Sequence, residues 1–406
     1  MLTESDHVTA TAEPARSDSF IGRLVVARLL ATVTLGRLHV VLPGGQRLSG
    51  RGAEAGPEAT LVLHRWRAIR RLLAGGDIGF SDAYIDGDWT SPDLAALIEL
   101  AALNQAQMTR TIAAMLPLRL WNRLSHALNA NSKRGSRRNI AFHYDLGNDF
   151  YRLWLDPSMT YSSALFEDRT QSLEAAQQAK IARILDLLEL DAGDSVLEIG
   201  CGWGGLAGAL GDAGAQVTGL TLSREQLAHA EQLMIERGLS DQVDLRLQDY
   251  RDAEGRYDRI VSIEMMEAVG ETYWPVYFGA LRERLKEGGV AVLQVITIAE
   301  DKFESYRRDP DFIQRHIFPG GMLPTKSAID GLAADAGLTL ERADHFGMGY
   351  ALTLAEWRRR FHAAWPEVQR LGFSEPFRRL WDYYLAYCEG GFRAGVIDVG
   401  LYKLRG

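Results

Sequence analysis

The fold is decided by the stretch Val196-Leu197-Glu198-Ile199-Gly200-Cys201-Gly202-Trp203-Gly204. A short apolar run here ends in closely spaced glycines, which is typical of a strand that turns directly into a helix. Because glycine has no side chain, the backbone of such a turn can approach a bound ligand closely. Gly205 also falls where the third glycine of a dinucleotide-binding turn would stand if the count begins at Gly200. The turn alone therefore predicts a ligand site without naming the ligand.

The sequence after Ser172 alternates between helical and strand-like segments. Helices are expected at residues 173–188, 206–212, 223–237 and 273–286, and strands at 195–199, 216–220, 243–247, 257–263 and 290–296. Such alternation predicts an α/β fold with a doubly wound, mostly parallel sheet that binds ligands at the carboxyl ends of its strands. Closing strands are expected at 338–342 and 346–354, and further helices at 356–365 and 377–388.

Polar residues follow three of these strands. Glu198 lies two positions before the first glycine, Thr221 ends the second strand where a ribose would sit, and Asp249 ends the third. An acidic side chain at that third position could accept a hydrogen bond from an adenine amino group. This set resembles the class I methyltransferases, which implies a bound S-adenosyl-L-methionine. The residues expected to bind it are Glu198, Gly200, Gly202, Gly204, Thr221, Leu222, Gln226, Gln248, Asp249 and Tyr250.

The N-terminal region has a different organisation. Residues 1–20 are polar and lack the apolar core of a secretion signal, so we expect a disordered tail. Residues 21–130 are expected to form a smaller α/β accessory domain with a basic linker, and residues 131–406 the catalytic domain. Within the accessory domain, helices are expected at 21–35, 66–73 and 94–106, and strands at 39–42 and 60–64.

The linker gathers basic residues with leucine and tryptophan between them. Its basic residues are Arg119, Arg123, Lys133, Arg134, Arg137 and Arg138. One interpretation is a solvated linker with a helix packed on the neighbouring domain. The other is an amphipathic patch that faces a membrane and binds lipid phosphates.

Composition limits the classes of function. The 406 residues include 45 basic and 53 acidic side chains, a net charge of -8, which argues against a general nucleic-acid binder. The two cysteines, Cys201 and Cys388, have no metal-binding spacing, so we expect no metal site and a reducing, cytoplasmic compartment. No apolar run is long enough to span a bilayer, so a lipid substrate would be met from the membrane surface.

Several motifs in a fixed order resemble the cyclopropane-fatty-acyl-phospholipid synthase family. They are HYDLGNDFY (143–151), LDPSMTYSSA (155–164), LEIGCGWGGLA (197–207), TLSREQ (221–226), LQDYRD (247–252), SIEMMEAVG (262–270), HIFPGG (316–321) and YCEGGFRA (387–394). The resemblance runs from about Arg138 to Arg393, and more loosely over the N-terminal region. It implies a lipid-binding accessory domain, a protein peripheral to the inner face of the membrane, and a homodimer. It also places Tyr161 and Ser162 at the cofactor.

The resemblance implies methyl transfer from the sulfonium to the double bond of an acyl chain in a phospholipid. The product of that transfer is a carbocation, and closure to a cyclopropane requires a base that removes a proton from the new methyl group. In well-described bacterial members that base is a bound bicarbonate. A different fate of the cation would give a methylene-branched, methyl-branched or furan fatty acid instead.

The bicarbonate-binding positions of the family fall on a mixed set of residues. The glutamate corresponds to Glu267, the cysteine to Ser163, the histidine to Gln294, the tyrosine to Arg358 and the backbone group to Ile296. Serine, glutamine and arginine all hydrogen-bond anions, so a bicarbonate or a carboxylate could be held there.

His143 and Tyr144 are further catalytic candidates, and the alternative for both is packing in the core. Two other functions stay open. One is a methyltransferase for a soluble small molecule, and the other is a lipid-binding protein that has lost catalysis.

Overall fold

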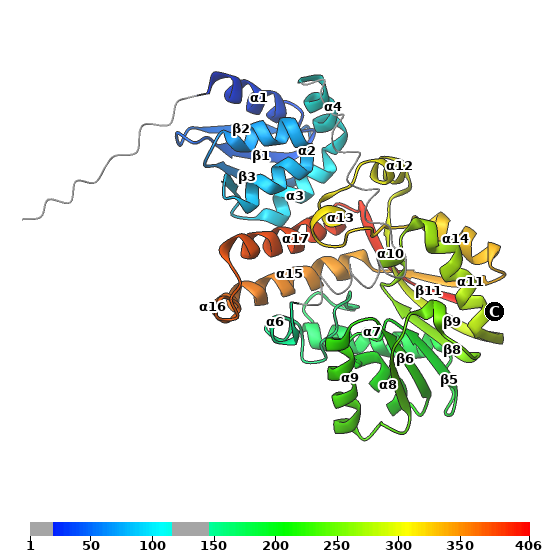
Figure 1. Ribbon diagram of the computed structural model, residues 1–406. Helices are drawn as coiled ribbons and strands as arrows, with labels where there is room; N and C mark the ends of the chain where they lie inside the picture. The colour runs from blue at the N-terminus through cyan, green and yellow to red at the C-terminus, as the bar shows by residue number, and fades with distance from the viewer. Residues whose placement is uncertain (1–18, 116–145) are drawn as a thin grey trace, which may run out of the picture.

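Two long helices, α15 (Gly347–Ala363) and α17 (Glu375–Arg393), lie between a small N-terminal sheet and a large C-terminal sheet (Figure 1). The structure is a computed structural model that describes residues 19–115 and 146–406. The tail predicted at 1–20 lies outside this range except for its last two residues, and helix α1 already begins at Phe20 with Ser19 as its cap. The basic linker also lies outside the described residues.

The large sheet has seven strands within the described residues, in the order β10-β11-β9-β8-β5-β6-β7. The strands are β5 (Ser195–Ile199), β6 (Gln216–Thr221), β7 (Val243–Leu247), β8 (Tyr257–Ile263), β9 (Leu285–Ile298), β10 (Thr339–His345) and β11 (Ile397–Arg405). Strands β5 to β9 pair in parallel, whereas β11 is antiparallel to both β9 and β10. The prediction of a mostly parallel, doubly wound sheet is confirmed, and the glycine turn lies at the carboxyl end of β5.

Helices cover both faces of this sheet. On one face lie α7 (Leu173–Leu188), α8 (Gly205–Asp212) and α9 (Arg224–Arg237), whose buried side chains share one apolar core with the strands. On the other lie α10 (Met266–Val269), α11 (Trp274–Arg284) and α14 (Lys326–Asp335), which share a second core. The shorter helices are α6 (Asn148–Arg152), α12 (Glu300–Arg308), α13 (Phe312–His316) and α16 (Trp365–Arg370).

The closing strands are only partly where the sequence predicts them. The strand expected at 338–342 is present as β10, but the strand expected at 346–354 is wrong, because these residues begin helix α15. Tyr350, Leu354, Trp357 and Phe361 recur at helical spacing and are all buried, so the segment has one apolar helix face. The second antiparallel strand is β11, at the end of the chain.

The small sheet belongs to the N-terminal region and has the order β2-β1-β3-β4 within the described residues. Its elements are α1 (Phe20–Leu30), β1 (Leu35–Val41), β2 (Arg47–Arg51), β3 (Glu54–Leu63), α2 (Arg67–Ile85), β4 (Trp89–Thr90), α3 (Leu94–Leu103) and α4 (Gln105–Met115). The α/β character expected for this region is confirmed.

The helix predicted at 94–106 is interrupted at Asn104. The buried Asn104 amide accepts from the backbone N–H of Thr34 at 2.7 Å and of Leu35 at 3.1 Å, and donates to the carbonyl of Leu35. These bonds fix the joint between α3 and α4 against the start of β1.

Helix α17 joins the two sheets. It packs against α15 on one side and against α2 and α3 on the other. A single apolar core therefore contains Val40 of β1, Leu97 of α3, Trp357 of α15 and Trp381 of α17. Tyr84 of α2 donates a hydrogen bond of 2.5 Å to the buried carboxylate of Asp382 across this junction.

Candidate active site

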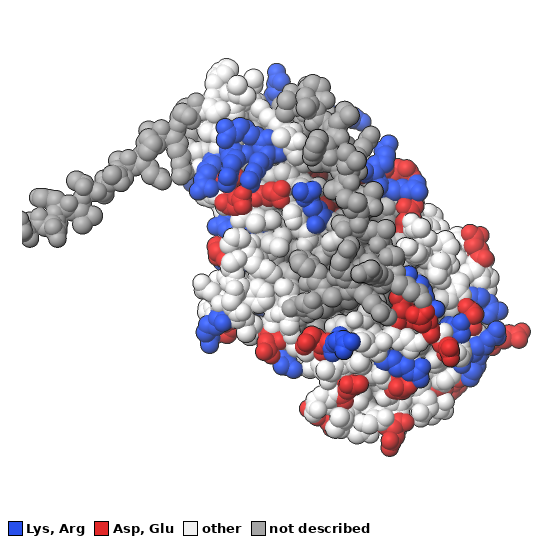
Figure 2. Space-filling model, viewed as in Figure 1, with Lys and Arg blue, Asp and Glu red and all other residues white. Residues whose placement is uncertain are grey.

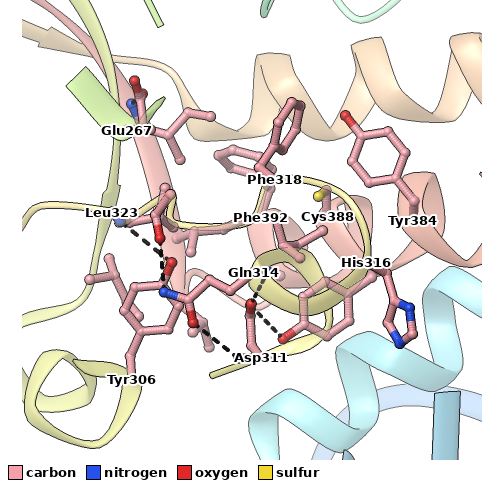
Figure 3. A pocket seen from close by; sticks show the side chains of 18 of the residues that line it. Glu267, Tyr306, Asp311, Gln314, His316, Phe318, Leu323, Tyr384, Cys388 and Phe392 are labelled. Atoms are coloured by element: carbon pink, nitrogen blue, oxygen red, sulfur yellow. Dashed lines mark hydrogen bonds between the residues drawn. The ribbon is translucent and has the colours of Figure 1, made fainter. Parts of the chain in front are cut away.

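A cavity of about 1630 Å³ extends from the glycine turn of the large sheet into the N-terminal region. Gly200 and Thr221 line one end, and Val40 and Leu61 line the other. Figure 3 shows its middle part, where Glu267 lies on one side and the aromatic ring of Tyr384 on the other. A long, mostly apolar space of this kind suits an extended hydrocarbon ligand.

The glycine turn shapes the cofactor end of the cavity. Gly200, Gly202 and Gly204 adopt φ angles of 85°, 52° and 86°, a region that favours glycine. A Cβ at Gly200 would lie 2.5 Å from the sulfur of Met265, so no larger residue fits there. Gly202 has no neighbouring heavy atom within 4 Å of the position of a Cβ, so its backbone faces open cavity. Gly204 does not line the cavity and packs against Ala230 of α9 instead.

Two polar groups at this end are buried and have no hydrogen-bond partner in the part of the chain that the structure describes. They are one carboxylate oxygen of Glu198, Oε2, and the hydroxyl of Tyr250. Burial raises the pKa of Glu198 to about 8 and that of Tyr250 to about 12. An unpaired buried polar atom costs free energy, so both groups suit a polar ligand such as S-adenosyl-L-methionine, whose amino and hydroxyl groups supply donors.

The residues at the ends of β6 and β7 contribute unequally to the cofactor end of the cavity. Thr221 donates to the side-chain carbonyl of Gln226 at 2.9 Å, and both line the cavity with Leu222, as does Gln248. Asp249 does not line it, because Arg251 holds both of its carboxylate oxygens, at 2.8 and 2.6 Å. The structure therefore does not support the expected contact between Asp249 and an adenine amino group.

Glu264 is the centre of a buried hydrogen-bond cluster. Its carboxylate accepts from the backbone N–H of Ser163 at 2.9 Å, the amide of Gln294 at 2.7 Å and the hydroxyl of Tyr350 at 2.7 Å. Burial raises its pKa above the usual value, while these donors act in the opposite direction. Glu264 also has a φ angle of 53°, which is rare and strained for a residue with a Cβ.

A buried lysine accompanies this carboxylate. Lys180 donates to the hydroxyl of Ser162 at 2.7 Å, and its charge interacts with Glu264. Burial lowers the pKa of Lys180 to about 8. Ser162 and Tyr161 both line the cavity, and the hydroxyl of Tyr161 lies 2.8 Å from that of Tyr384.

Glu267 lies on helix α10, directly after the carboxyl end of β8. One carboxylate oxygen, Oε1, accepts from the backbone N–H of Ile296, and the other, Oε2, is buried without a hydrogen-bond partner among the described residues. Burial and the nearby charge of Glu264 raise the pKa of Glu267 to about 8. A carboxylate with one free oxygen in an apolar cavity can accept a proton from a bound substrate.

Arg358 is not part of this cluster, contrary to its expected place. Its guanidinium lies 2.7 Å from Asp382 and 3.9 Å from Glu389, outside the cavity lining. Tyr350, two helical turns earlier on α15, supplies the phenolic hydroxyl near the carboxylates. The sequence did not indicate Tyr350 as a site residue, because residues 346–354 were expected to form a strand. Only the helix shows that Tyr350 lies on the buried face of this segment.

The other predicted catalytic residues divide into two groups. Ser163 and Gln294 are fully buried and contact Glu264 without lining the cavity, and the hydroxyl of Ser163 donates to the carbonyl of Ala164. His143 and Tyr144 lie outside the described residues. In residues 19–115 and 146–406, no three His, Cys, Asp or Glu side chains are grouped so that they could hold a metal ion. None of the described helices has the length and apolar character needed to cross a bilayer.

The fold and the site together define a class I methyltransferase. A strand that ends in a glycine turn, at the carboxyl edge of a sheet in this strand order, is the feature on which the class depends. The family model described as mycolic acid cyclopropane synthetase matches residues 131–401, and the chain belongs to this family. It is therefore an S-adenosylmethionine-dependent methyltransferase that acts in fatty acid modification.

Individual relatives agree with this assignment. Tuberculostearic acid methyltransferase of Mycobacterium tuberculosis is 38% identical over 99% of this chain and 96% of its own length. Cyclopropane-fatty-acyl-phospholipid synthase of Escherichia coli is 37% identical over 82% of this chain and 84% of its own. The solved structure of mycolic acid cyclopropane synthase CmaA1 complexed with SAH and CTAB is 34% identical, with a TM-score of 0.62 over 66% of this chain and 98% of that one.

Proposed function

We propose that this enzyme transfers a methyl group to the double bond of an unsaturated acyl chain in a membrane phospholipid, and that the product is methylene-branched. The observation that carries the proposal is the position of Glu267, a buried carboxylate with one free oxygen in a mostly apolar cavity next to the cofactor turn. A soluble small-molecule substrate would leave most of that cavity unused.

The reaction balances without an external oxidant or reductant. The alkene attacks the methyl carbon of S-adenosyl-L-methionine, the bond from that carbon to the sulfonium sulfur breaks, and S-adenosyl-L-homocysteine leaves as a neutral thioether, with a cation on the other alkene carbon. A hydride shift moves the cation to the methylated carbon, and Glu267 then accepts a proton from the new methyl group. This gives a methylene branch, in which the double bond joins the chain to a terminal CH2 group. A saturated methyl branch needs a further hydride, which a separate reductase would supply.

The cavity walls suit the cationic intermediate. Phe318 and Phe392 line the cavity between Glu267 and Tyr384, which lies on the opposite side (Figure 3). The faces of aromatic rings attract positive charge, and an apolar wall keeps water from quenching the cation. The charge of Glu264 acts in the same direction.

We further propose that Glu264 takes the place of a bound bicarbonate. The Ser163 and Gln294 positions, expected to hold that anion, already bind the Glu264 carboxylate, and the N–H of Ile296 already binds Glu267. A second anion beside two carboxylates would be repelled and would lack donors. The described residues therefore do not fit a bicarbonate.

Two relatives support different products. The name of the relative that matches 99% of the chain supports branching, and the name of the Escherichia coli relative supports ring closure. Ring closure would use the same base, because it also removes a proton from the new methyl group. The two reactions differ in whether the hydride shift precedes proton loss.

One experiment separates these outcomes. The enzyme is incubated with methyl-labelled cofactor and vesicles of dioleoyl phospholipid, and the fatty acid methyl esters are examined by proton NMR. We expect labelled acyl chains with vinylidene protons. Ring methylene protons would instead establish cyclopropanation, and the absence of label in lipid would refute the lipid substrate.

A further inference from the structure

The cavity extends beyond the cofactor turn and Glu267. The cavity here measures about 1630 Å³ and continues past the reaction site into the N-terminal region. Six of the apolar side chains in this extension define what we call the N-terminal chamber: Leu30, Val40, Leu61, Ile69, Leu72 and Leu97.

The chamber is built from every layer of the N-terminal region. Helices α1, α2 and α3 and strands β1 and β3 each contribute at least one of its side chains. These side chains are at most 9% exposed, and all of them except Leu72 belong to the same apolar core, yet they border open space. An apolar space of this kind accepts hydrocarbon and not a polar ligand.

A charged rim lies between the chamber and the reaction site. Arg110 of α4, Arg308 of α12 and Arg315 of α13 are exposed and line the cavity. No ion pair within 4.0 Å joins them to a described carboxylate, although the charge of Arg315 acts on Asp82. Carboxylates also line this part of the cavity, namely Asp77, Asp301, Asp309 and Asp311. Arginine binds phosphate oxygens well, so the rim suits a phosphate group.

The surface around the chamber is suited to a membrane. Figure 2 shows basic side chains gathered over the N-terminal region on this face, with acidic side chains beside them, and in residues 19–115 the basic ones are all arginines. Helix α1, whose Leu30 lines the chamber, exposes Phe20 by 80% and Ile21 by 71%. An exposed apolar helix end beside basic side chains is typical of contact with a lipid surface.

We propose that the N-terminal chamber holds the second acyl chain of a two-chain phospholipid, while the first chain reaches Glu267 and the phosphate lies at the arginine rim. This inference rests on the proposed function, because it assumes an acyl substrate. It assigns the N-terminal region to substrate binding and explains why one cavity connects it with the reaction site.

The test compares two substrates that share a headgroup. One is a dioleoyl phospholipid, and the other is the corresponding 1-oleoyl lysophospholipid, both in the same detergent micelles. The variant Val40→Phe fills part of the chamber. Its control is Val41→Phe, because neighbouring residues of a strand point to opposite faces and Val41 does not line the cavity.

We expect Val40→Phe to raise KM for the two-chain substrate about tenfold, as small volume changes in apolar pockets do. The KM of Val40→Phe for the one-chain substrate should equal that of the wild-type enzyme. The KM of Val41→Phe should equal the wild-type value for both substrates. Equal effects on the two substrates, or no effect on either, would contradict the proposal that the chamber holds the second acyl chain. A wild-type enzyme that methylates neither substrate would instead refute the proposed function.

A second pair of variants avoids the core altogether. Ala106→Trp places a large side chain at an exposed position that lines the cavity, and Ala334→Trp places one on the exposed face of α14, away from it. We expect only Ala106→Trp to discriminate against the two-chain substrate. Loss of activity on both substrates in this variant would show that the opening serves the reacting chain alone, and would overturn the proposal.

Discussion

Two glutamates three residues apart have different environments. Glu264 has donors on its carboxylate, whereas Glu267 keeps one oxygen free. The donors on Glu264 oppose the rise in its pKa that burial causes. The free oxygen is the reason why we propose Glu267 as the proton acceptor. This division of roles depends on contacts with β9 and α15 that are distant in the sequence.

Replacing Glu267 by glutamine should lower kcat by about 10²–10⁴-fold, the usual contribution of a general base. Cofactor affinity, measured by calorimetry, should stay unchanged because the amide is isosteric. The matched control is Glu271→Gln, whose carboxylate pairs with Arg307 outside the cavity. Activity that survives in Glu267→Gln would show that another group accepts the proton.

The raised pKa of Glu267 predicts a pH dependence. A base must be ionised to accept a proton, so kcat/KM should rise with pH and level off above about 8, the pKa of this carboxyl. As pH falls through that value the carboxyl becomes protonated and activity is lost. A profile that is flat from pH 6 to 9 would contradict this assignment.

At the scale of single elements, helix α15 differs most from expectation, because its residue Arg358 does not lie in the expected anion-binding site. Its residue Arg358 binds Asp382 of α17, which also accepts from His362 and Tyr84. The guanidinium therefore connects helices and does not contact the reacting groups.

Arg358→Met should consequently destabilise the fold without impairing the folded enzyme. Loss of a charged hydrogen bond typically costs about 1.5–3 kcal/mol. Denaturant unfolding should show this decrease in the free energy of unfolding, while kcat of the folded fraction stays within error of wild type. A selective loss of kcat with unchanged stability would show that Arg358 acts in catalysis.

The hydrophobic pattern of the sequence predicted the regularly alternating helices and strands. It did not predict elements and contacts that depend on residues far apart in the sequence. Strands β5 to β9 alternate with helices along the chain, so these strands, a mostly parallel sheet and the glycine turn could be expected from the sequence. Strand β11 was not expected from the sequence, although it is nine residues long, and it pairs with the distant strands β9 and β10. Likewise, the residues that follow β7 gave no sign that Arg251 would bind the carboxylate of Asp249.

For the molecule as a whole, the shared core has a thermodynamic consequence. Side chains from β1, α3, α15 and α17 form one continuous apolar core. Elements that share a core lose their packing together, so unfolding should be cooperative across the junction.

Calorimetry should therefore show one unfolding transition for the full chain. Cofactor at a concentration of about 100 times its Kd should stabilise the whole protein by about 2.7 kcal/mol. Two transitions, of which the cofactor shifts only one, would show that the N-terminal region unfolds independently.

The left-handed backbone at Glu264 has an evolutionary consequence. Glycine is the residue best suited to a φ angle of 53°, so Glu264→Gly would relieve strain while removing the carboxylate. Ser163, Gln294 and Tyr350 would then surround an empty space with their donors. We expect added formate to restore activity to this variant in a concentration-dependent way, measured as label transfer to lipid, and no rescue in Glu267→Gln. A change in one codon would thus replace the carboxylate of Glu264 with an anion that binds from solution.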